Sequence, residues 1–125
     1  MKKTLAFAAL ALAGCQSPAD RPDPPALADF QWEKRVVLHH NAPTSALKLD
    51  SDTQKAFDNR DLVFLAAGED LQQKFRLTGT DPVFVLIGKD GGEKARQTGS
   101  LPLQKWFDLI DSMPMRQREM REEAP

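Results

Sequence analysis

The stretch VFVLIGKDGG, at residues 83–92, decides the fold of this chain. Its first half is a short, unbroken run of apolar residues, a pattern typical of a strand that is covered on both faces. The glycines and Asp90 of its second half predict a tight turn. The polar residues 93–98 that follow predict an edge strand, because charged side chains discourage an edge from pairing with another chain. The stretch therefore predicts a β-hairpin with one buried strand and one edge strand.

Two more apolar runs lie upstream, at residues 36–38 and 62–67. They predict two further buried strands, so helices are expected on both faces of the sheet. The segments that separate the three runs have about the length that parallel crossovers need. Residues 46–59 and 69–77 carry apolar residues at helical spacing and predict the two helices of these connections.

A last helix is predicted after the hairpin. Ser100 is of a residue type that caps helix N-termini, and an apolar stripe at helical spacing follows it. Pro114 is expected to interrupt or kink this helix. The stripe consists of Leu103, Trp106, Phe107 and Ile110.

The predicted elements follow one another as strand, helix, strand, helix, strand, strand, helix. This order, βαβαββα, resembles that of the thioredoxin fold, a three-layer α/β fold with a mixed central sheet and helices on both faces. Asp81 and Pro82 stand directly before the third apolar run, where the thioredoxin superfamily carries a cis-proline beside its active site. The resemblance implies a thioredoxin-like fold with its functional groove near Pro82.

A closer resemblance rests on FQWEKRVV at residues 30–37, NRDLV at 59–63, LIGKDGGEK at 86–94 and DSMPMR at 111–116. These stretches resemble an uncharacterised thioredoxin-like domain family, a domain of unknown function of bacterial secreted proteins and lipoproteins. Related domains occur in animal sushi-repeat and coiled-coil-containing matrix proteins. The resemblance covers about residues 29–122. It implies the fold and a compartment outside the cytoplasm, but no biochemical activity.

The N-terminus has the features of a secretory signal peptide: a basic start, an apolar run at residues 5–12 and small residues before Cys15. The apolar run is far shorter than the ~20 residues that a membrane-spanning helix needs. LAGC at residues 12–15 also resembles the bacterial lipobox, in which a lipid such as palmitate is attached to the cysteine and the chain is cut before it. Gln16 follows where an aspartate would mark inner-membrane retention, so the resemblance implies the outer membrane, facing the periplasm. If the segment is instead an ordinary signal peptide, Cys15 is a bystander.

These signals divide the chain into a lipoprotein signal peptide at 1–14, a lipid-anchored proline-rich spacer at 15–28, a thioredoxin-like domain at 29–115 and a charged tail at 116–125. The spacer has too few large apolar side chains to fold by itself. The tail is expected to be solvated or to form a terminal helix. Its Arg116 is a candidate partner of Arg60 and Asp61 in an ion-pair cluster.

The composition excludes several classes of function. The 125 residues suffice for one domain, and a net charge of −1 gives no electrostatic reason to expect a nucleic-acid partner. The single cysteine excludes an internal disulfide framework, a Cys-x-x-Cys redox pair and a zinc site built on several thiolates. Membrane contact is expected through the lipid on that cysteine.

In a redox thioredoxin the paired cysteines follow the first strand, but here that loop carries no thiol. No serine or threonine can replace the reversible electron transfer of a thiolate. We therefore expect a degenerate site that binds a periplasmic protein or a small ligand, with no catalytic residue and no cofactor. The expected binding groove consists of Asn41, Ala42, Pro43, Thr44, Ser45, Asp81 and Pro82.

A second hypothesis is a copper-handling protein. The thioethers of Met113 and Met115 belong to the soft ligands that select Cu(I), and His39 or His40 would add a nitrogen ligand. Adjacent strand residues point to opposite faces, so the two histidines cannot easily bind one metal together. Methionines near a helix end also fit a hydrophobic core.

A peroxiredoxin-like enzyme and a purely structural envelope protein are two further hypotheses. Pro43 and Thr44 resemble the peroxiredoxin loop, but the peroxidatic cysteine is missing. Such an enzyme would therefore have a degenerate active site.

Overall fold

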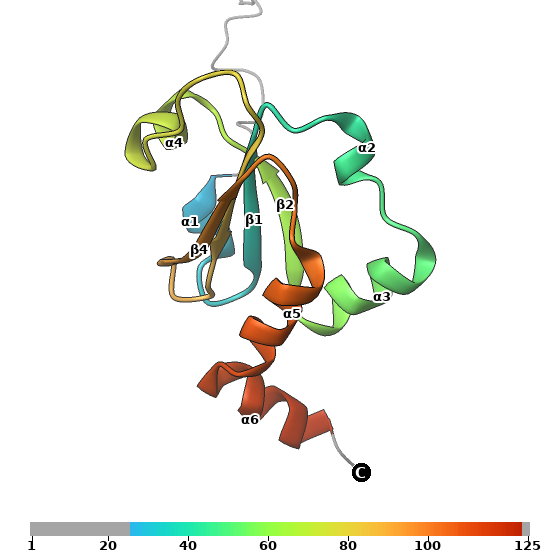
Figure 1. Ribbon diagram of the computed structural model, residues 1–125. Helices are drawn as coiled ribbons and strands as arrows, with labels where there is room; N and C mark the ends of the chain where they lie inside the picture. The colour runs from blue at the N-terminus through green and yellow to red at the C-terminus, as the bar shows by residue number, and fades with distance from the viewer. Residues whose placement is uncertain (1–25, 124–125) are drawn as a thin grey trace, which may run out of the picture.

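The computed structural model describes residues 26–123. The predicted signal peptide, Cys15 and all but the end of the predicted spacer lie outside the described residues. Figure 1 shows the strands between helices on either side. The elements are α1 (Leu27–Phe30), β1 (Arg35–His40), α2 (Thr44–Leu47), α3 (Ser51–Asn59), β2 (Leu62–Ala66), α4 (Glu69–Lys74), β3 (Val83–Ile87), β4 (Glu93–Thr98), α5 (Leu103–Asp111) and α6 (Pro114–Glu123).

The strands form a mixed sheet in the order β2-β1-β3-β4. β1 and β2 run parallel, whereas β3 runs antiparallel to both β1 and β4. The predicted hairpin is confirmed, with β3 buried along its whole length and the charged β4 at the edge. The connection from β2 to β3 is not the parallel crossover that its length suggested, because β3 lies on the far side of β1 and runs against it.

A hydrophobic core lies on each face of the sheet. This arrangement follows from the unbroken apolar runs, because successive strand residues point to opposite faces and both faces must then be covered. The core under α1 and α4 contains Leu27, Val36, Leu38, Phe75, Leu77, Val83, Val85 and Ile87. The core under α3 and α5 contains Val37, Phe57, Leu62, Phe84, Leu86, Trp106, Phe107 and Ile110. The chain thus has the predicted α/β, thioredoxin-like fold.

The helix predicted at residues 46–59 is divided into α2 and α3. Asp50 causes the division, because its side-chain oxygen accepts a hydrogen bond of 2.8 Å from the backbone N–H of Thr53 and caps α3. Its own backbone is extended. A side chain that bonds to the backbone in this way competes with a continuous helix.

Two other predicted helix ends are displaced. α4 ends at Lys74, and the left-handed backbone of Arg76, with a φ of 57°, follows shortly after. Ser100 does not cap α5, because the N-cap position belongs to Pro102. The carbonyl oxygen of Ser100 instead accepts a hydrogen bond of 3.1 Å from the side-chain amide of Gln97.

The C-terminal charged segment is helical and packs on the rest of the fold. α5 ends at Asp111, and Pro114 begins α6 rather than kinking α5, because proline suits the first position of a helix. The expected end of the domain at residue 115 therefore falls inside α6. Arg116 is only 5% exposed, so this helix is joined to the folded unit. At the other end, the fold begins before residue 29, since Leu27 is buried.

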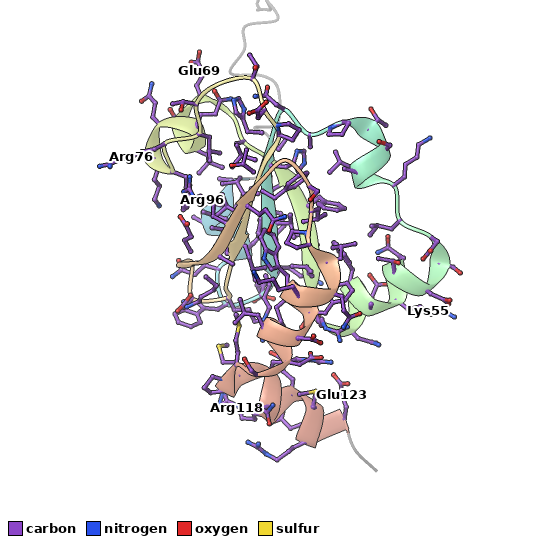
Figure 2. All side chains as sticks on the ribbon, viewed as in Figure 1. Lys55, Glu69, Arg76, Arg96, Arg118 and Glu123 are labelled. Atoms are coloured by element: carbon purple, nitrogen blue, oxygen red, sulfur yellow. The ribbon has the colours of Figure 1, made fainter. Side chains whose placement is uncertain are left out.

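Charged side chains cover the outside of the molecule. Lys55, Glu69 and Arg118, labelled in Figure 2, lie at its periphery on α3, α4 and α6. Within residues 26–123, no helix has both the length and the apolar character that crossing a bilayer requires.

Candidate functional site

The predicted groove residues lie where β1 ends. Asn41 has a left-handed backbone, with a φ of 60°, a conformation that asparagine adopts more readily than most residues. Its side-chain amide donates hydrogen bonds to the carbonyl oxygens of Gly79, at 2.9 Å, and Asp81, at 3.4 Å. The loop after β1 is thereby held beside the loop before β3. The structure thus brings the two halves of the predicted groove together.

Pro82 follows a trans peptide bond, as do the other described residues, whereas the thioredoxin superfamily carries a cis-proline at this place. Its carbonyl oxygen accepts a hydrogen bond of 2.8 Å from the backbone N–H of Gly99. Gly99 has a φ of 100°, where a side chain would strain the backbone. This bond holds the loop between β4 and α5 close to the predicted groove.

The hollow at this end of the molecule is displaced from the predicted groove. Its volume is about 400 Å³, and it lies between the α2–α3 segment and the loop that leads into α5. Of the predicted groove residues, Ser45 lines this hollow, Ala42 packs against the core, and Pro43, Thr44 and Asp81 are exposed. The full lining is Ser45, Ala46, Lys48, Leu49, Asp50, Thr53, Gly99, Ser100, Leu101 and Leu103. We call this hollow the α2–α5 groove.

The α5 side of this groove was missed by the sequence analysis. Gly99 and Leu101 match no motif, and Ser100 was interpreted only as a helix cap. The pairing of β4 with β3 places these residues opposite α2. The hydrogen bond between Gly99 and Pro82 is a consequence of that register, which local sequence does not reveal.

The two histidines lie at the same end of β1 and are half-buried. The ring of His39 meets Phe64 edge-on, with 5.9 Å between the ring centroids. Burial lowers the pKa of His39, which favours the neutral form of its imidazole. His40 pairs with Val83 of β3.

The predicted methionine ligands lie at the other end of β1. Met113 and Met115 line a second hollow together with Arg35, the first residue of that strand. His39 lies four residues after Arg35 on an extended strand, which corresponds to about 13 Å. The structure therefore does not bring the predicted copper ligands together. The described residues also contain no group of three or more His, Cys, Asp or Glu side chains that could hold a metal.

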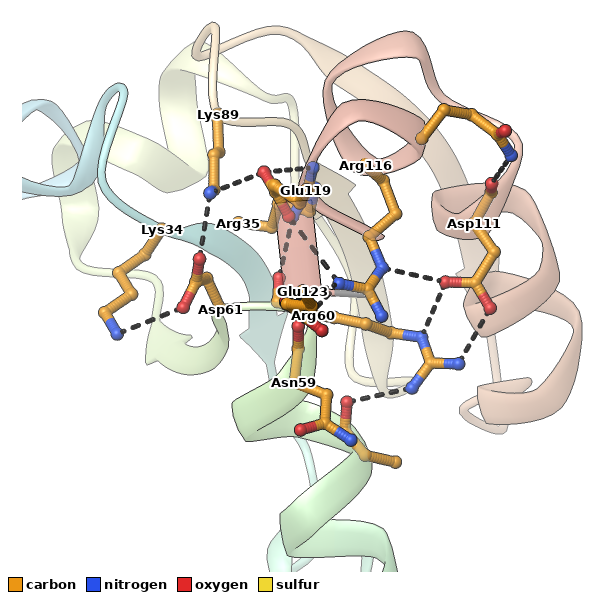
Figure 3. Close-up of polar contacts among 12 residues, drawn as sticks. Lys34, Arg35, Asn59, Arg60, Asp61, Lys89, Asp111, Arg116, Glu119 and Glu123 are labelled. Atoms are coloured by element: carbon orange, nitrogen blue, oxygen red, sulfur yellow. Dashed lines mark hydrogen bonds and ion pairs between the residues drawn. The ribbon is translucent and has the colours of Figure 1, made fainter. Parts of the chain in front are cut away.

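Charged side chains form a connected cluster (Figure 3), two members of which, Arg35 and Lys89, also line the second hollow. The members of this ion cluster are Lys34, Arg35, Arg60, Asp61, Lys89, Asp111, Arg116, Glu119 and Glu123. They come from residues on or beside β1, α3, β2, β3, α5 and α6. The cluster therefore joins most of the fold at one end.

Glu119 of α6 is the centre of one half of the ion cluster. Its carboxylate accepts hydrogen bonds from Arg35, at 3.1 and 3.2 Å, and from Lys89, at 2.8 Å. Lys89 also donates to Asp61, at 2.9 Å. Arg35 is only 1% exposed and Lys89 only 9%. Two nearly buried cations thus depend on the same carboxylate.

Asp111 of α5 is the centre of the other half. It accepts hydrogen bonds of 3.1 and 2.8 Å from Arg60 and one of 3.2 Å from Arg116. Arg116 also donates to the carbonyl oxygen of Asn59, at 2.8 Å, and Arg35 to that of Arg60, at 2.8 Å. These bonds fix α5 and α6 to the end of α3.

These contacts shift the pKa values of the groups involved. Burial alone would raise the pKa of Glu119, but its bonds to Arg35 and Lys89 outweigh burial and lower that pKa. Burial and two arginine partners act on Asp111 in the same way, and its pKa is also lowered. Burial would lower the pKa of Lys89, but its two carboxylate partners raise it. These shifts favour the charged forms of Glu119, Asp111 and Lys89.

The predicted meeting of Arg60 and Arg116 in an ion-pair cluster is confirmed. The two arginines share Asp111, however, while Asp61 pairs with Lys89 and Lys34. The sequence analysis missed most of the remaining members. The family resemblance contained a signal that could have identified them. Each of its four stretches, at 30–37, 59–63, 86–94 and 111–116, contributes residues to the cluster or to the lining of the second hollow.

Comparisons with known proteins agree with the fold. A family model described as a domain of unknown function (DUF4174) matches residues 65–119. The chain is similar in structure to a reduced 2-Cys peroxiredoxin from Plasmodium vivax, with a TM-score of 0.55 and 12% sequence identity over 74% of this chain and 84% of that chain. At this identity the likeness shows the fold alone. The search of curated proteins found no match. Together these findings support a thioredoxin-like fold for the chain and a similarity, over residues 65–119, to a domain family of unknown function.

Proposed function

We propose that the protein is a lipid-anchored binding module of the bacterial outer membrane, facing the periplasm, whose thioredoxin-like domain performs no redox chemistry. The observation that carries the proposal is the loop after β1. This loop carries no thiol, and the side-chain amide of Asn41 at its start donates hydrogen bonds to the carbonyl oxygens of Gly79 and Asp81. A group used in this way supports the fold and has no capacity for electron transfer.

The α2–α5 groove is the proposed binding surface. Ligand sites combine an apolar lining with a few placed polar groups. Leu49, Leu101 and Leu103 supply the apolar part, and Ser45 and Ser100 supply hydroxyl groups on opposite sides. This combination suits a segment of a periplasmic protein, because its backbone would meet hydroxyl groups and its side chains would meet leucines.

The anchor and the compartment are proposed from the N-terminal sequence. The lipobox-like LAGC at residues 12–15 supports lipid attachment to Cys15, and the resemblance to a family of bacterial secreted proteins and lipoproteins supports the same compartment. The proposed kinship with animal matrix domains rests on that resemblance too. Stable anchoring needs more than one acyl chain, at ~0.8 kcal/mol per buried methylene, and lipoprotein processing supplies two or three.

Metabolic labelling tests the anchor. Cells that express the full chain should incorporate labelled palmitate into it, and the protein should fractionate with the outer membrane. The Cys15→Ser variant should lose both the label and the membrane association. Wild-type protein that carries no label, or that fractionates with the soluble periplasm, would contradict the proposed anchor.

Photo-crosslinking in whole cells tests the groove. A photoreactive residue at position 45 and one at position 100 should yield an adduct with the same protein, because the two positions face the groove from opposite sides. Position 122, exposed on α6, is the control and should yield no such adduct. Adducts that form equally from position 122 would overturn the groove, and measurable disulfide-reductase or peroxidase turnover would overturn the non-redox function.

A further inference from the structure

The second hollow has the features of a binding site that the proposed function does not use. Its volume is about 260 Å³, and it lies between the β3–β4 turn, the start of β1 and the start of α6. One side is cationic, with Arg35, Lys89 and Lys94, and the other is apolar, with Met113, Pro114 and Met115. We call this hollow the α6 pocket.

The ion cluster beside the pocket carries one more positive than negative charge. Its cations are Lys34, Arg35, Arg60, Lys89 and Arg116, and its anions are Asp61, Asp111, Glu119 and Glu123. Removal of the most exposed member of each sign, Lys34 and Glu123, leaves the excess unchanged. Lys94 and Asp90, at the rim of the pocket, form a neutral pair at 2.8 Å. Buried charges are normally balanced, so the pocket is suited to a ligand with a single negative charge.

The two buried cations of the pocket have hydrogen-bonding capacity left. A guanidinium has five N–H donors and an ammonium three. Among the described residues, Arg35 makes three side-chain hydrogen bonds and Lys89 makes two. Both residues line the pocket. An anionic group there would meet donors that the cluster does not use.

The start of α6 adds to the positive character of the pocket. α6 is ten residues long, and its first two residues, Pro114 and Met115, line the pocket. The N-terminus of a helix carries a partial positive charge that favours a nearby anion. This partial charge adds to the full charges of the lining side chains, which are the main source of attraction for an anion.

The apolar side of the pocket indicates what kind of body the anionic group of the ligand would be attached to. Thioethers are flexible and make favourable contacts with aromatic rings. An apolar cavity of about 150 Å³ holds benzene, so the larger volume of this pocket has room for a ring together with its charged group. We propose that the α6 pocket binds a small organic monoanion, a carboxylate on an apolar body about the size of an aromatic ring. This site lies at the opposite end of β1 from the α2–α5 groove, and the proposal does not depend on that groove.

Methionine-methyl NMR of the full lipidated chain in detergent tests the proposal, with benzoate as the probe. Met113 and Met115 line the pocket, whereas Met120, further along α6, does not and serves as an internal reference. The methyl signals of Met113 and Met115 should shift saturably with benzoate, while that of Met120 stays in place. Benzamide has the same ring without the charge and should bind at least about tenfold more weakly, because it lacks the ion pair.

A pair of charge-reversed variants separates the pocket from general charge effects. Lys94→Glu reverses a cation in the lining, and Lys105→Glu reverses an exposed cation of α5 outside it. Lys94→Glu should weaken benzoate binding about tenfold, and Lys105→Glu should leave it within about twofold. An unchanged Met120 signal will verify that both variants are folded. Shifts that do not saturate, equal binding of benzamide, or equal effects of the two variants would each overturn the proposal.

Discussion

The guanidinium of Arg35, at the start of the first strand, donates hydrogen bonds of 3.1 and 3.2 Å to the carboxylate of Glu119 in the last helix. This contact joins residues 84 positions apart and fastens α6 to the sheet. Arg35 is almost completely buried, and Glu119 is the carboxylate that pairs with its charge. The charged C-terminal segment is thus a structural element of the domain.

Replacement of Glu119 by glutamine should destabilise the protein. Loss of this carboxylate leaves Arg35 without its partner and Lys89 with only Asp61. Removal of one member of a buried ion pair typically costs about 3 kcal/mol or more, so a decrease of about 3 kcal/mol in the free energy of unfolding is expected. Urea denaturation measures it. Glu122→Gln, on the exposed side of the same helix, is the control and should change stability by less than about 0.5 kcal/mol. Equal effects of the two substitutions would refute the central role of Glu119.

Stability should decrease as the solution is acidified. The pKa values of Glu119 and Asp111 in the folded protein lie below their ordinary values of 4.5 and 3.8. Their contribution to the free energy of unfolding is therefore complete at pH values above these ordinary pKa values. It is lost as the pH falls through the lower pKa values of the folded protein. Asp90 and Glu93 also have lowered pKa values and act in the same direction. The free energy of unfolding, measured by urea denaturation at a series of pH values from 7 to below 4, should show this loss.

The share of Glu119 in this pH dependence can be isolated by subtraction. Glu119→Gln removes one titrating group while Asp111, Asp90 and Glu93 remain. The stability difference between the wild type and this variant should therefore shrink at low pH, where Glu119 is protonated in both folded and unfolded wild-type protein. A difference that stays constant across the pH range would show that ionisation of Glu119 does not stabilise the fold.

Asn41 should be needed for its conformation as well as for its hydrogen bonds. Asn41→Ala loses the bonds to Gly79 and Asp81 and places alanine at a φ of 60°. Asn41→Gly loses the same bonds but adopts this φ without strain. Alanine should therefore cost about 1 kcal/mol more than glycine in the free energy of unfolding. Urea denaturation of both variants measures the difference, and equal stabilities would refute a conformational role.

The strands could be predicted from sequence because their signal is local. Each of β1, β2 and β3 contains an unbroken apolar run, and the glycines at 91 and 92 mark the turn that leads into β4. A short apolar run bounded by turn residues has few other ways to be buried. The order of the strands in the sheet could not be predicted in the same way. The length of the β2–β3 connection does not determine on which side of β1 the next strand pairs.

The ion cluster could be predicted only in part because its contacts are long-range. Arg60 and Arg116 were expected to belong to one ion-pair cluster. The carboxylate that pairs with both of them is Asp111, whose place on the polar face of a predicted helix indicated only a solvated side chain. The charged residues of α6 likewise have the pattern of a solvated tail. Only the folded structure shows that one of them, Glu119, pairs with Arg35 and Lys89. Local sequence does not distinguish an exposed charge from one that meets a partner on another element.

The core under α5 should be sensitive to the loss of a single side chain. Ile110 is completely buried against the sheet, whereas the neighbouring Leu109 is 36% exposed. Ile110→Ala removes buried methyl groups and leaves a cavity, so the free energy of unfolding should fall by about 2–5 kcal/mol. Leu109→Ala removes a side chain of the same size from the other face of α5 and should cost clearly less. Urea denaturation of the two variants measures this contrast. If Leu109→Ala were as damaging as Ile110→Ala, the orientation of α5 described above would be wrong, because the helix would then bury its other face.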